Sequence, residues 1–376
     1  MEKTRVIILF GGRSAEHEVS LLSARNVFVA LDRNRFEPVL IGIDKQGRWR
    51  PEAEQTLLAA TGDPRSQALK AVGSPLDVPV YPESSDLTTT PGSNLTTTPR
   101  MVLRRDDVVF PVLHGTYGED GTVQGLLELA DIAYVGPGTL GSAVGMDKDV
   151  TKRLLAQAGI PVVPWRLVRA ADLARDRAAT LAQASELGFP VFTKPANAGS
   201  SVGVSKVMSA GQLEPALQTA LGFDSKVLVE AAVNAREIEC AVLGNDEPQA
   251  SLPAEIIVHH KDGFYSYDAK YVDVDGSEAK IPADLPPEMS NRVRKLAVET
   301  FRCLELSGMA RVDFFLDRQG GGLYVNEVNT IPGFTAISMY PQLWAASGLP
   351  QKELISRLID LAIERRTARR KLKTEI

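Results

Sequence analysis

The sequence has few of the residues that build metal centres or disulfide frameworks. Its 376 residues include two cysteines, Cys240 and Cys303, and four histidines, and none of them stand at metal-ligand or redox spacing. Two isolated cysteines are typical of buried small side chains in a reducing compartment. We therefore expect neither a histidine- or cysteine-based metal site nor thiol chemistry.

Long apolar runs and an excess of positive charge are also absent. The first apolar run, residues 6–10, is too short for a signal peptide or a membrane span and is typical of a core strand. The net charge of -5 and the pI near 5.6 argue against a nucleic-acid scaffold, so any phosphate site must be local. We expect a cytoplasmic protein that binds neither nucleic acid nor membrane.

The chain does contain a strand–helix–strand rhythm, which is typical of an α/β protein. Apolar strands at residues 5–12 and 36–44 flank a helical stretch at 20–32, and this order predicts a parallel sheet. Residues 82–100 contain the unit LTTTP twice and indicate a solvated loop insertion. A helix that begins at Asp147 or Asp149 indicates a domain boundary.

Acidic and amide side chains near the C-terminal end of the sequence indicate a possible cation site. Glu327 and Asn329 in "YVNEVN" are two residues apart and so share one face of a strand, as do Arg311 and Asp313 in "RVDFFL". If these strands pair, Asp313 approaches Glu327 and Asn329, and an oxygen-only set suits magnesium held together with substrate phosphates. The alternative is a salt-bridged edge hairpin that Arg311 neutralises.

A nucleotide would need contacts of its own. "KPANAGSSVGV" places Lys194 before a Gly/Ser loop whose backbone N–H groups can approach anionic oxygens, although such a loop can also be a simple turn. Lys148 adds positive charge, and the chain has no GxxxxGK[ST] motif. Glu230 and Glu237, seven residues apart, are candidates for an adenine amino group and a ribose hydroxyl.

Two loops of the first third also carry polar residues. "FGGRSAEHEVS" lacks GxGxxG, and the carboxylate of Glu16 would repel a pyrophosphate, so it fits a substrate ammonium group better. His114 in "HGTYGEDG" is either a substrate contact or only a hydrogen-bonded residue of a tight loop.

Six stretches together resemble the D-alanine–D-alanine ligases of the ATP-grasp superfamily: "GGRSAEHEVS", "HGTYGEDG", "KPANAGSSVGVSKV", "FYSYDAKY", "RVDFFL" and "NEVNTIPGFTAISMYP". They occur in the expected order and span nearly the whole chain. The resemblance implies an α/β fold of three domains: a Rossmann-like N-terminal domain (1–147), a central ATP-grasp subdomain (148–237), and a C-terminal ATP-grasp subdomain with a lid and a metal site (238–376).

The resemblance also implies the reaction. The enzyme would join two D-alanines to D-alanyl-D-alanine for peptidoglycan precursors, with ATP as cosubstrate, an acyl phosphate as intermediate and ADP as product. It would use two Mg²⁺ or Mn²⁺ ions and act as a homodimer, and residues 259–282 would form a lid that excludes water.

Roles follow motif by motif from the same resemblance. Residues matched to the first D-alanine site are Glu16, His114, Ser200 and Tyr271. Matched oxyanion stabilisers are Arg311 and the backbone of Gly333. Matched contacts of the second D-alanine's carboxylate are Ser338 and Met339. Matched phosphate contacts are Lys148, Lys194, Ser201 and Lys270. Matched adenine and ribose contacts are Glu230, Val233, Glu237 and Phe264. The metal ligands would be Asp313, Glu327 and Asn329.

One departure and two alternatives remain. Some family members have lysine and tryptophan where this chain has Ala231 and Ala232, so adenine contact here would depend on the backbone. A ligase that joins D-alanine to D-lactate is one alternative, which Tyr271 in "YDAKY" disfavours. A nucleotide-binding regulatory protein that has lost turnover is the other.

Overall fold

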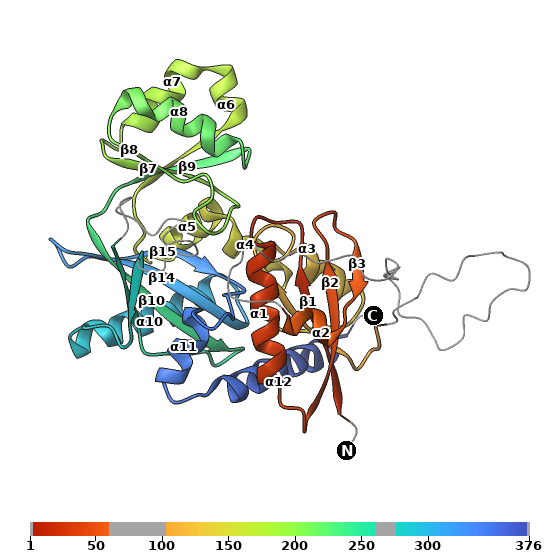
Figure 1. Ribbon diagram of the computed structural model, residues 1–376. Coiled ribbons are helices and arrows are strands. Elements are labelled where there is room, and N and C mark those ends of the chain that lie inside the picture. The colour runs from red at the N-terminus through yellow and green to blue at the C-terminus, as the bar shows by residue number, and fades with distance from the viewer. Residues whose placement is uncertain (1–2, 60–102, 260–275, 374–376) are drawn as a thin grey trace, which may run out of the picture.

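The computed structural model describes residues 3–59, 103–259 and 276–373. Three sheets organise this part of the chain (Figure 1). The first has strand order β3-β2-β1-β4-β5, built from β1 (Thr4–Gly11), β2 (Phe36–Ile43), β3 (Trp49–Pro51), β4 (Val108–Leu113) and β5 (Ala133–Tyr134). The β1–β2, β1–β4 and β4–β5 pairs are parallel, so the predicted parallel sheet is confirmed.

Helices pack on both faces of this first sheet because its central strands are apolar on both sides. They are α1 (His17–Ala30), α2 (Glu54–Leu58) and α3 (Thr122–Leu129), whereas α4 (Thr139–Met146) contacts α3, α5 (Lys148–Gln157) and β15 (Leu323–Asn329). Helix α1 begins three residues before the predicted stretch, directly after Glu16. The described chain has no helix that is both long and apolar enough to cross a membrane.

The second sheet is small and antiparallel, with strand order β6-β9-β7-β8. Its elements are β6 (Trp165–Arg169), α6 (Ala170–Arg175), α7 (Arg177–Ser185), β7 (Val191–Pro195), β8 (Ser205–Val207), α8 (Ala210–Leu221) and β9 (Lys226–Ala231). Its buried apolar side chains form a cluster of their own, in which Val191, Leu217 and Val229 are fully buried. Figure 1 shows this unit standing apart from the other two sheets.

The third sheet follows the order β13-β12-β10-β14-β15, with β11 paired to β10. Its strands are β10 (Ala235–Gly244), β11 (Gln249–Ala250), β12 (Ala254–Val258), β13 (Ser277–Lys280), β14 (Gly308–Asp317) and β15 (Leu323–Asn329). Its helices are α5 (Lys148–Gln157), α10 (Pro287–Cys303), α11 (Met339–Ala346) and α12 (Gln351–Arg369). The predicted helix start is confirmed, because the Asp147 carboxylate accepts hydrogen bonds from the N–H groups of Asp149 and Val150.

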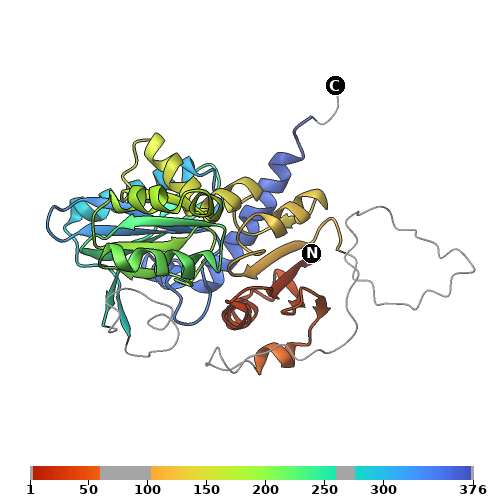
Figure 2. The ribbon, with the colours of Figure 1, turned by 90° about the horizontal axis from the view of Figure 1, so that it is seen from above.

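Helix α12 joins the first and third sheets. It contacts β4 and β5 on one side and β10 and β14 on the other, and Figures 1 and 2 show it alongside both units. A single buried cluster includes Phe10 and Phe110 of the first sheet, Leu243 of β10, and Leu358 of α12. The first and third sheets therefore share one apolar core, whereas the second sheet has its own.

Two predicted features cannot be placed. The repeat at residues 82–100 and most of the predicted lid, including Phe264, Lys270 and Tyr271, lie outside the described residues. The end of the predicted lid segment is strand β13, which pairs with β12.

Candidate functional site

The predicted pairing of the two C-terminal strands is confirmed. Strands β14 and β15 are antiparallel, with Asp313 opposite Glu327 and Arg311 opposite Asn329, and a bulge follows Asp313. On the other side of β14, strand β10 places Glu239 opposite Asp313. Glu239, Asp313 and Glu327 therefore form one row of carboxylates across three neighbouring strands, next to a bulge of the kind that often re-aims side chains at active sites.

Arg311 lies beside this row and neutralises part of it. Its Nε and Nη2 donate to the two carboxylate oxygens of Asp313 at 2.7 Å each, and Nε lies 3.1 Å from Glu239 Oε2. The side-chain amide of Asn329 donates to Asp313 Oδ2 at 2.9 Å. Both sequence-based interpretations are thus present in one place: an oxygen cluster and a salt-bridged hairpin.

The donor set matches a hard cation only in combination with other oxygens. In the described residues, no group of three or more His, Cys, Asp or Glu side chains is placed to hold a metal ion. Asp313 and Glu327 supply two carboxylates and Asn329 one amide oxygen, so further ligands would have to come from water or from a bound phosphate. Mg²⁺ binds in this manner, since it is usually coordinated by one or two carboxylates, substrate phosphates and several waters.

A cleft lies between the second and third sheets. Its polar lining comprises Lys148, Lys194, Ser201, Glu237, Glu239, Asp313, Asn326 and Glu327, and its apolar walls include Phe192 of β7 and Phe315 of β14. The cleft thus brings two lysines, a row of carboxylates and apolar surface together where the second and third sheets meet.

Lys148 stands where the two polar sets meet. As the first residue of α5, it donates its backbone N–H to Ala196 O at 3.1 Å and its ammonium group to Ala198 O at 2.7 Å. Its Nζ also lies 3.7 Å from Glu327 Oε2. One lysine thereby connects the start of the Gly/Ser loop with the carboxylate row.

The Glu230 carboxylate lies between two lysines rather than facing the cleft. Its oxygens pair with Lys194 Nζ at 2.5 Å and with Lys152 Nζ at 2.6 Å, and its side chain is almost fully buried. Burial alone would raise the pKa of Glu230, but Lys152 and Lys194 together lower it to about 2. Glu230 is therefore ionised and holds Lys194 toward the cleft, and a contact between its side chain and adenine stays a prediction.

The sequence interpretation missed Lys152 and Glu239. Lys152 is one helical turn after Lys148 on α5, and that i, i+4 spacing places both ammonium groups on the same helix face. Glu239 is two residues after Glu237 on β10, so both carboxylates share the face that borders the cleft. These spacings were the available signals.

A second, smaller pocket, the Glu16 pocket, is lined by Ser200, which contacts Glu16, and shares Lys148 and Glu327 with the cleft. The hydroxyl of Ser200 donates to the Glu16 carboxylate, which is buried. A Cβ at Gly115 or at Gly199 would lie only 2.8 Å or 2.6 Å from Glu16 Oε2. A side chain at either position would therefore displace this carboxylate, and Gly115 also has a φ of +75°, which favours glycine.

His114 is fully engaged by protein groups. Its Nδ1 is 3.1 Å from Ile331 O, and its Nε2 is 3.1 Å from the hydroxyl of Ser23, which itself accepts the N–H of Phe334. We assign the proton to Nδ1 on this network. Burial lowers the pKa of His114, although Glu16 opposes the effect, so the ring is neutral. His114 is thus hydrogen-bonded within the protein, as one of the two interpretations expected. Its partners, Ile331 and Ser23, lie outside its own loop.

Glu119 is a buried carboxyl that the sequence interpretation overlooked. Its Oε2 accepts from Gly115 N at 2.6 Å and its Oε1 from Ile331 N at 3.3 Å, so it joins the first sheet to the loop after β15. Burial, with a further contribution from Glu16, raises the pKa of Glu119 to about 8. The signal in the sequence was an acidic residue inside the quoted motif "HGTYGEDG".

We expect Glu119 to make folding stability fall as the pH rises. The folded protein keeps this proton up to about pH 8, whereas an unfolded glutamate releases it near pH 4.5, so the contribution is full below pH 4.5 and is lost as the pH approaches 8. Glu119→Gln should flatten the decline. The measurement is the urea-unfolding free energy at pH 5, 6, 7 and 8, with Asp120→Asn in the same loop as control. Equal slopes for wild type and Glu119→Gln would contradict the assignment.

The predicted second-substrate residues lie in the segment that leads into α11. The Ser338 hydroxyl accepts from Thr335 N at 2.9 Å, and a Cβ at Gly333 would lie 2.8 Å from that oxygen. The side chain of Met339 is buried in the core shared by the first and third sheets, so only its backbone can face a ligand. Val233 is half-buried between β9 and β10, where the chain crosses from the second sheet to the third.

Comparison with known proteins agrees with this arrangement. Residues 5–137 match the family model described as D-ala D-ala ligase N-terminus, and residues 154–360 match D-ala D-ala ligase C-terminus. The chain is 51% identical over 366 residues to a D-alanine–D-alanine ligase A of Chromobacterium violaceum, covering 97% of this chain and 96% of the relative. It is 48% identical to the D-alanine–D-alanine ligase A of Escherichia coli, and both chains are covered completely.

Solved structures are similar over the same extent. The D-alanine-D-alanine ligase of Coxiella burnetii has a TM-score of 0.79 at 36% identity and covers 99% of this chain and 97% of its own. The VanG D-Ala:D-Ser ligase of Enterococcus faecalis also has a TM-score of 0.79, at 35% identity, with 96% and 100% coverage. Sequence, fold and site geometry therefore agree, and this chain belongs to the D-alanine–D-alanine ligase family.

Proposed function

We propose that this protein joins two D-alanines to D-alanyl-D-alanine and converts ATP to ADP and phosphate. The observation that carries the proposal is one continuous site: two lysines and a carboxylate row line the same cleft, and the Glu16 pocket adjoins them through Lys148 and Glu327. A ligase that makes an acyl phosphate needs this juxtaposition, because the γ-phosphate must meet the carboxylate of the first amino acid.

ATP would occupy the cleft with its phosphates toward the lysines. Lys148 and Lys194 supply positive charge, and the backbone of the loop that contains Ser201 covers the phosphates. Glu237 is placed for the ribose hydroxyls, and the backbone near Val233 for the adenine edge. The resemblance adds Phe264 as the residue stacked on adenine and Lys270 as a further phosphate contact. Glu230 contributes indirectly, because its carboxylate holds the Lys194 ammonium group in position for the phosphates.

Asp313, Glu327 and Asn329 would hold Mg²⁺ or Mn²⁺, and the resemblance favours two ions. Such ions supply charge neutralisation of the phosphates when bound. Arg311 and the backbone N–H of Gly333 would stabilise the oxyanion of the tetrahedral intermediate, a role in which one lost donor costs about 3–4 kcal/mol.

The amino-acid sites would lie on either side of the acyl carbon. The Glu16 carboxylate takes the ammonium group of the first D-alanine. Ser200, Tyr271 and His114 hold the Glu16 carboxylate in position. The first D-alanine's carboxylate attacks the γ-phosphorus, and ADP leaves. The amine of the second D-alanine, whose carboxylate is held near Ser338 and the Met339 backbone, then attacks the acyl carbon, and phosphate leaves.

We expect Glu16→Gln to weaken the use of D-alanine far more than the binding of ATP. A charge-assisted hydrogen bond to the ammonium group is worth about 1.5–3 kcal/mol, so kcat/KM for D-alanine should fall about 10- to 150-fold. Steady-state kinetics with each substrate varied in turn provides the measurement. An equal loss in the affinity for ATP would place Glu16 on the nucleotide side or give it a structural role.

A product assay tests the proposed function. The protein is incubated with ATP, Mg²⁺ and D-alanine, alone or with D-lactate or D-serine, across pH 6 to 9, and the products are separated by mass spectrometry. We expect D-alanyl-D-alanine as the main product. Mainly ester would favour the D-lactate alternative, mainly D-alanyl-D-serine would assign the specificity of the similar VanG ligase, and ATP binding without turnover would indicate a regulatory protein.

Assembly and organisation complete the proposal. We infer a cytoplasmic homodimer with a first domain at 1–147, a central subdomain at 148–237 and a C-terminal subdomain at 238–376. The resemblance supports the dimer, and the two isolated cysteines support a reducing compartment. Sedimentation velocity at micromolar concentration measures the oligomeric state.

A further inference from the structure

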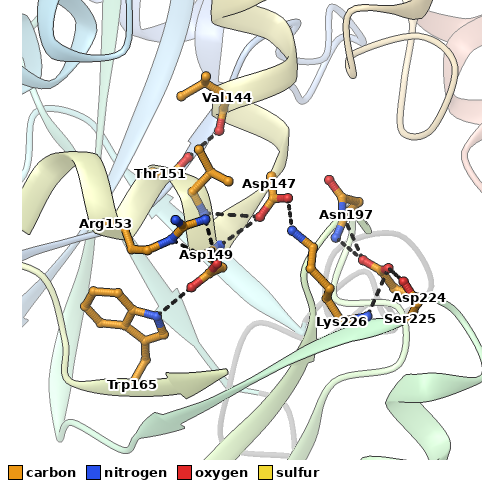
Figure 3. Close-up of polar contacts among 11 residues, drawn as sticks. Val144, Asp147, Asp149, Thr151, Arg153, Trp165, Asn197, Asp224, Ser225 and Lys226 are labelled. Atoms are coloured by element: carbon orange, nitrogen blue, oxygen red, sulfur yellow. Dashed lines mark hydrogen bonds and ion pairs between the residues drawn. The ribbon is translucent and has the colours of Figure 1, made fainter. Parts of the chain in front are cut away.

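The turn between α8 and β9 holds the beginning of the Gly/Ser loop. Asp224 Oδ2 accepts from the backbone N–H of Asn197 at 2.8 Å and from its side-chain amide at 2.9 Å. Asp224 Oδ1 accepts from Lys226 N at 3.2 Å, which fixes the carboxylate at the start of β9. Figure 3 shows Asn197 and Asp224 facing each other. Asn197 is therefore anchored by two bonds to a residue of another element.

The same turn also contacts the end of that loop. Gly203 has a φ of +72°, and a Cβ there would lie 2.6 Å from the Phe223 ring and 3.0 Å from Pro195 Cγ. Phe223 is 58% exposed, so the ring that borders Gly203 is also open to solvent. Phe223 and Asp224, adjacent in sequence, thus contact opposite ends of the loop at residues 197–203.

A third contact connects the turn to the phosphate-facing lysine. Lys226 pairs with the Asp147 carboxylate, which caps α5 immediately before Lys148 (Figure 3). Burial opposes ionisation of Asp147, but its hydrogen bonds to Lys226 and to backbone N–H groups lower its pKa overall. One short segment therefore sets the position of both the loop and the helix that carry the proposed phosphate contacts.

We propose that Phe223 and Asp224 are positioning residues that clamp the two ends of the Gly/Ser loop and keep it closed over the reacting phosphate. The inference deepens the proposed function and rests on it. Neither residue lines the cleft or the Glu16 pocket among the described residues, so both act through the loop.

The consequence concerns water. A closed loop leaves the second D-alanine's amine as the nucleophile at the acyl carbon, with phosphate as the leaving group. If the loop opens, water attacks the acyl phosphate, and its hydrolysis returns D-alanine and phosphate without a peptide bond. A loosened clamp should therefore raise the ratio of phosphate released to dipeptide formed, which is one in a coupled enzyme.

The experiment measures this ratio in Asp224→Ala and Phe223→Ala at saturating ATP and D-alanine. We expect it to rise at least about two-fold in each variant, because the intermediate is no longer shielded from water. Asn197→Ala keeps the backbone bond to Asp224, so its ratio should lie between those of wild type and Asp224→Ala. Met208→Ala is the matched control, since Met208 is 57% exposed and its backbone N–H bonds to the Gln212 side chain in the same unit.

A purely structural role would lower the amount of active protein without changing the ratio. Ratios that stay at one in Asp224→Ala and Phe223→Ala, with circular dichroism confirming the fold, would overturn the clamp even if KM for ATP rises. If Asp224→Ala does not fold, Phe223→Ala and Asn197→Ala decide the question on the same criterion. Failure of wild type to make dipeptide would overturn the proposed function instead, so the two failures are distinguishable.

Discussion

Replacing Glu327 with glutamine is expected to lower magnesium-dependent turnover at least about 100-fold while the protein stays folded. Glu327 faces Asp313 across the β14–β15 pair, and the substitution removes one charge from the oxygen set at nearly constant volume. Packing should change little, because the side chain is only half-buried.

Three measurements separate the metal role from a structural one. Turnover is followed across a Mg²⁺ titration, Mg²⁺-dependent ATP binding is measured by calorimetry, and thermal unfolding reports the fold. Glu299→Gln, on helix α10 and paired there with Lys295, serves as the matched control. Unchanged activity at limiting Mg²⁺ would remove Glu327 from the metal site.

Glu230→Gln should have the largest effect on stability. It leaves the ammonium groups of Lys152 and Lys194 without their shared carboxylate, and removing one partner of a buried ion pair typically costs about 3–5 kcal/mol of unfolding free energy. Lys194 also loses the group that holds it toward the cleft, so KM for ATP should rise. Lys152→Met should cost less, because Lys194 still neutralises Glu230.

A double-mutant cycle tests whether the three residues act as one unit. Lys152→Met combined with Glu230→Gln removes one lysine together with the carboxylate, so the combined loss should be smaller than the sum of the single losses. Denaturant unfolding of the four proteins provides the free energies. Additive losses would mean that Lys152 and Glu230 stabilise the fold independently.

Features that depend on local pattern could be predicted from the sequence. The parallel strands of the first sheet follow from apolar runs on either side of a helix, and the start of α5 follows from a capping aspartate. The approach of Asp313 to Glu327 follows from the two-residue period of paired strands.

Features that depend on how deeply a side chain is buried, or on contacts with residues far away in the sequence, could not be predicted. The sequence gives no sign that the Met339 side chain is buried in the core or that the Glu230 carboxylate meets Lys152, because both facts arise from how separate sheets pack. The raised pKa of Glu119 has the same origin, since burial depends on the Ile331 loop that closes over it. Local propensity carries no information about such contacts.

Because α12 packs between the first and third sheets, the N-terminal part of the chain depends on a helix from the C-terminal end to cover its apolar surface. The apolar side chains of Phe10 and Phe110 are buried in a cluster that also contains Leu358 of α12, more than 200 residues later in the sequence. A recombinant fragment that ends near Met146 would expose that face to water. The first sheet should therefore aggregate when expressed alone, and shortened versions of this enzyme should keep their C-terminal helix.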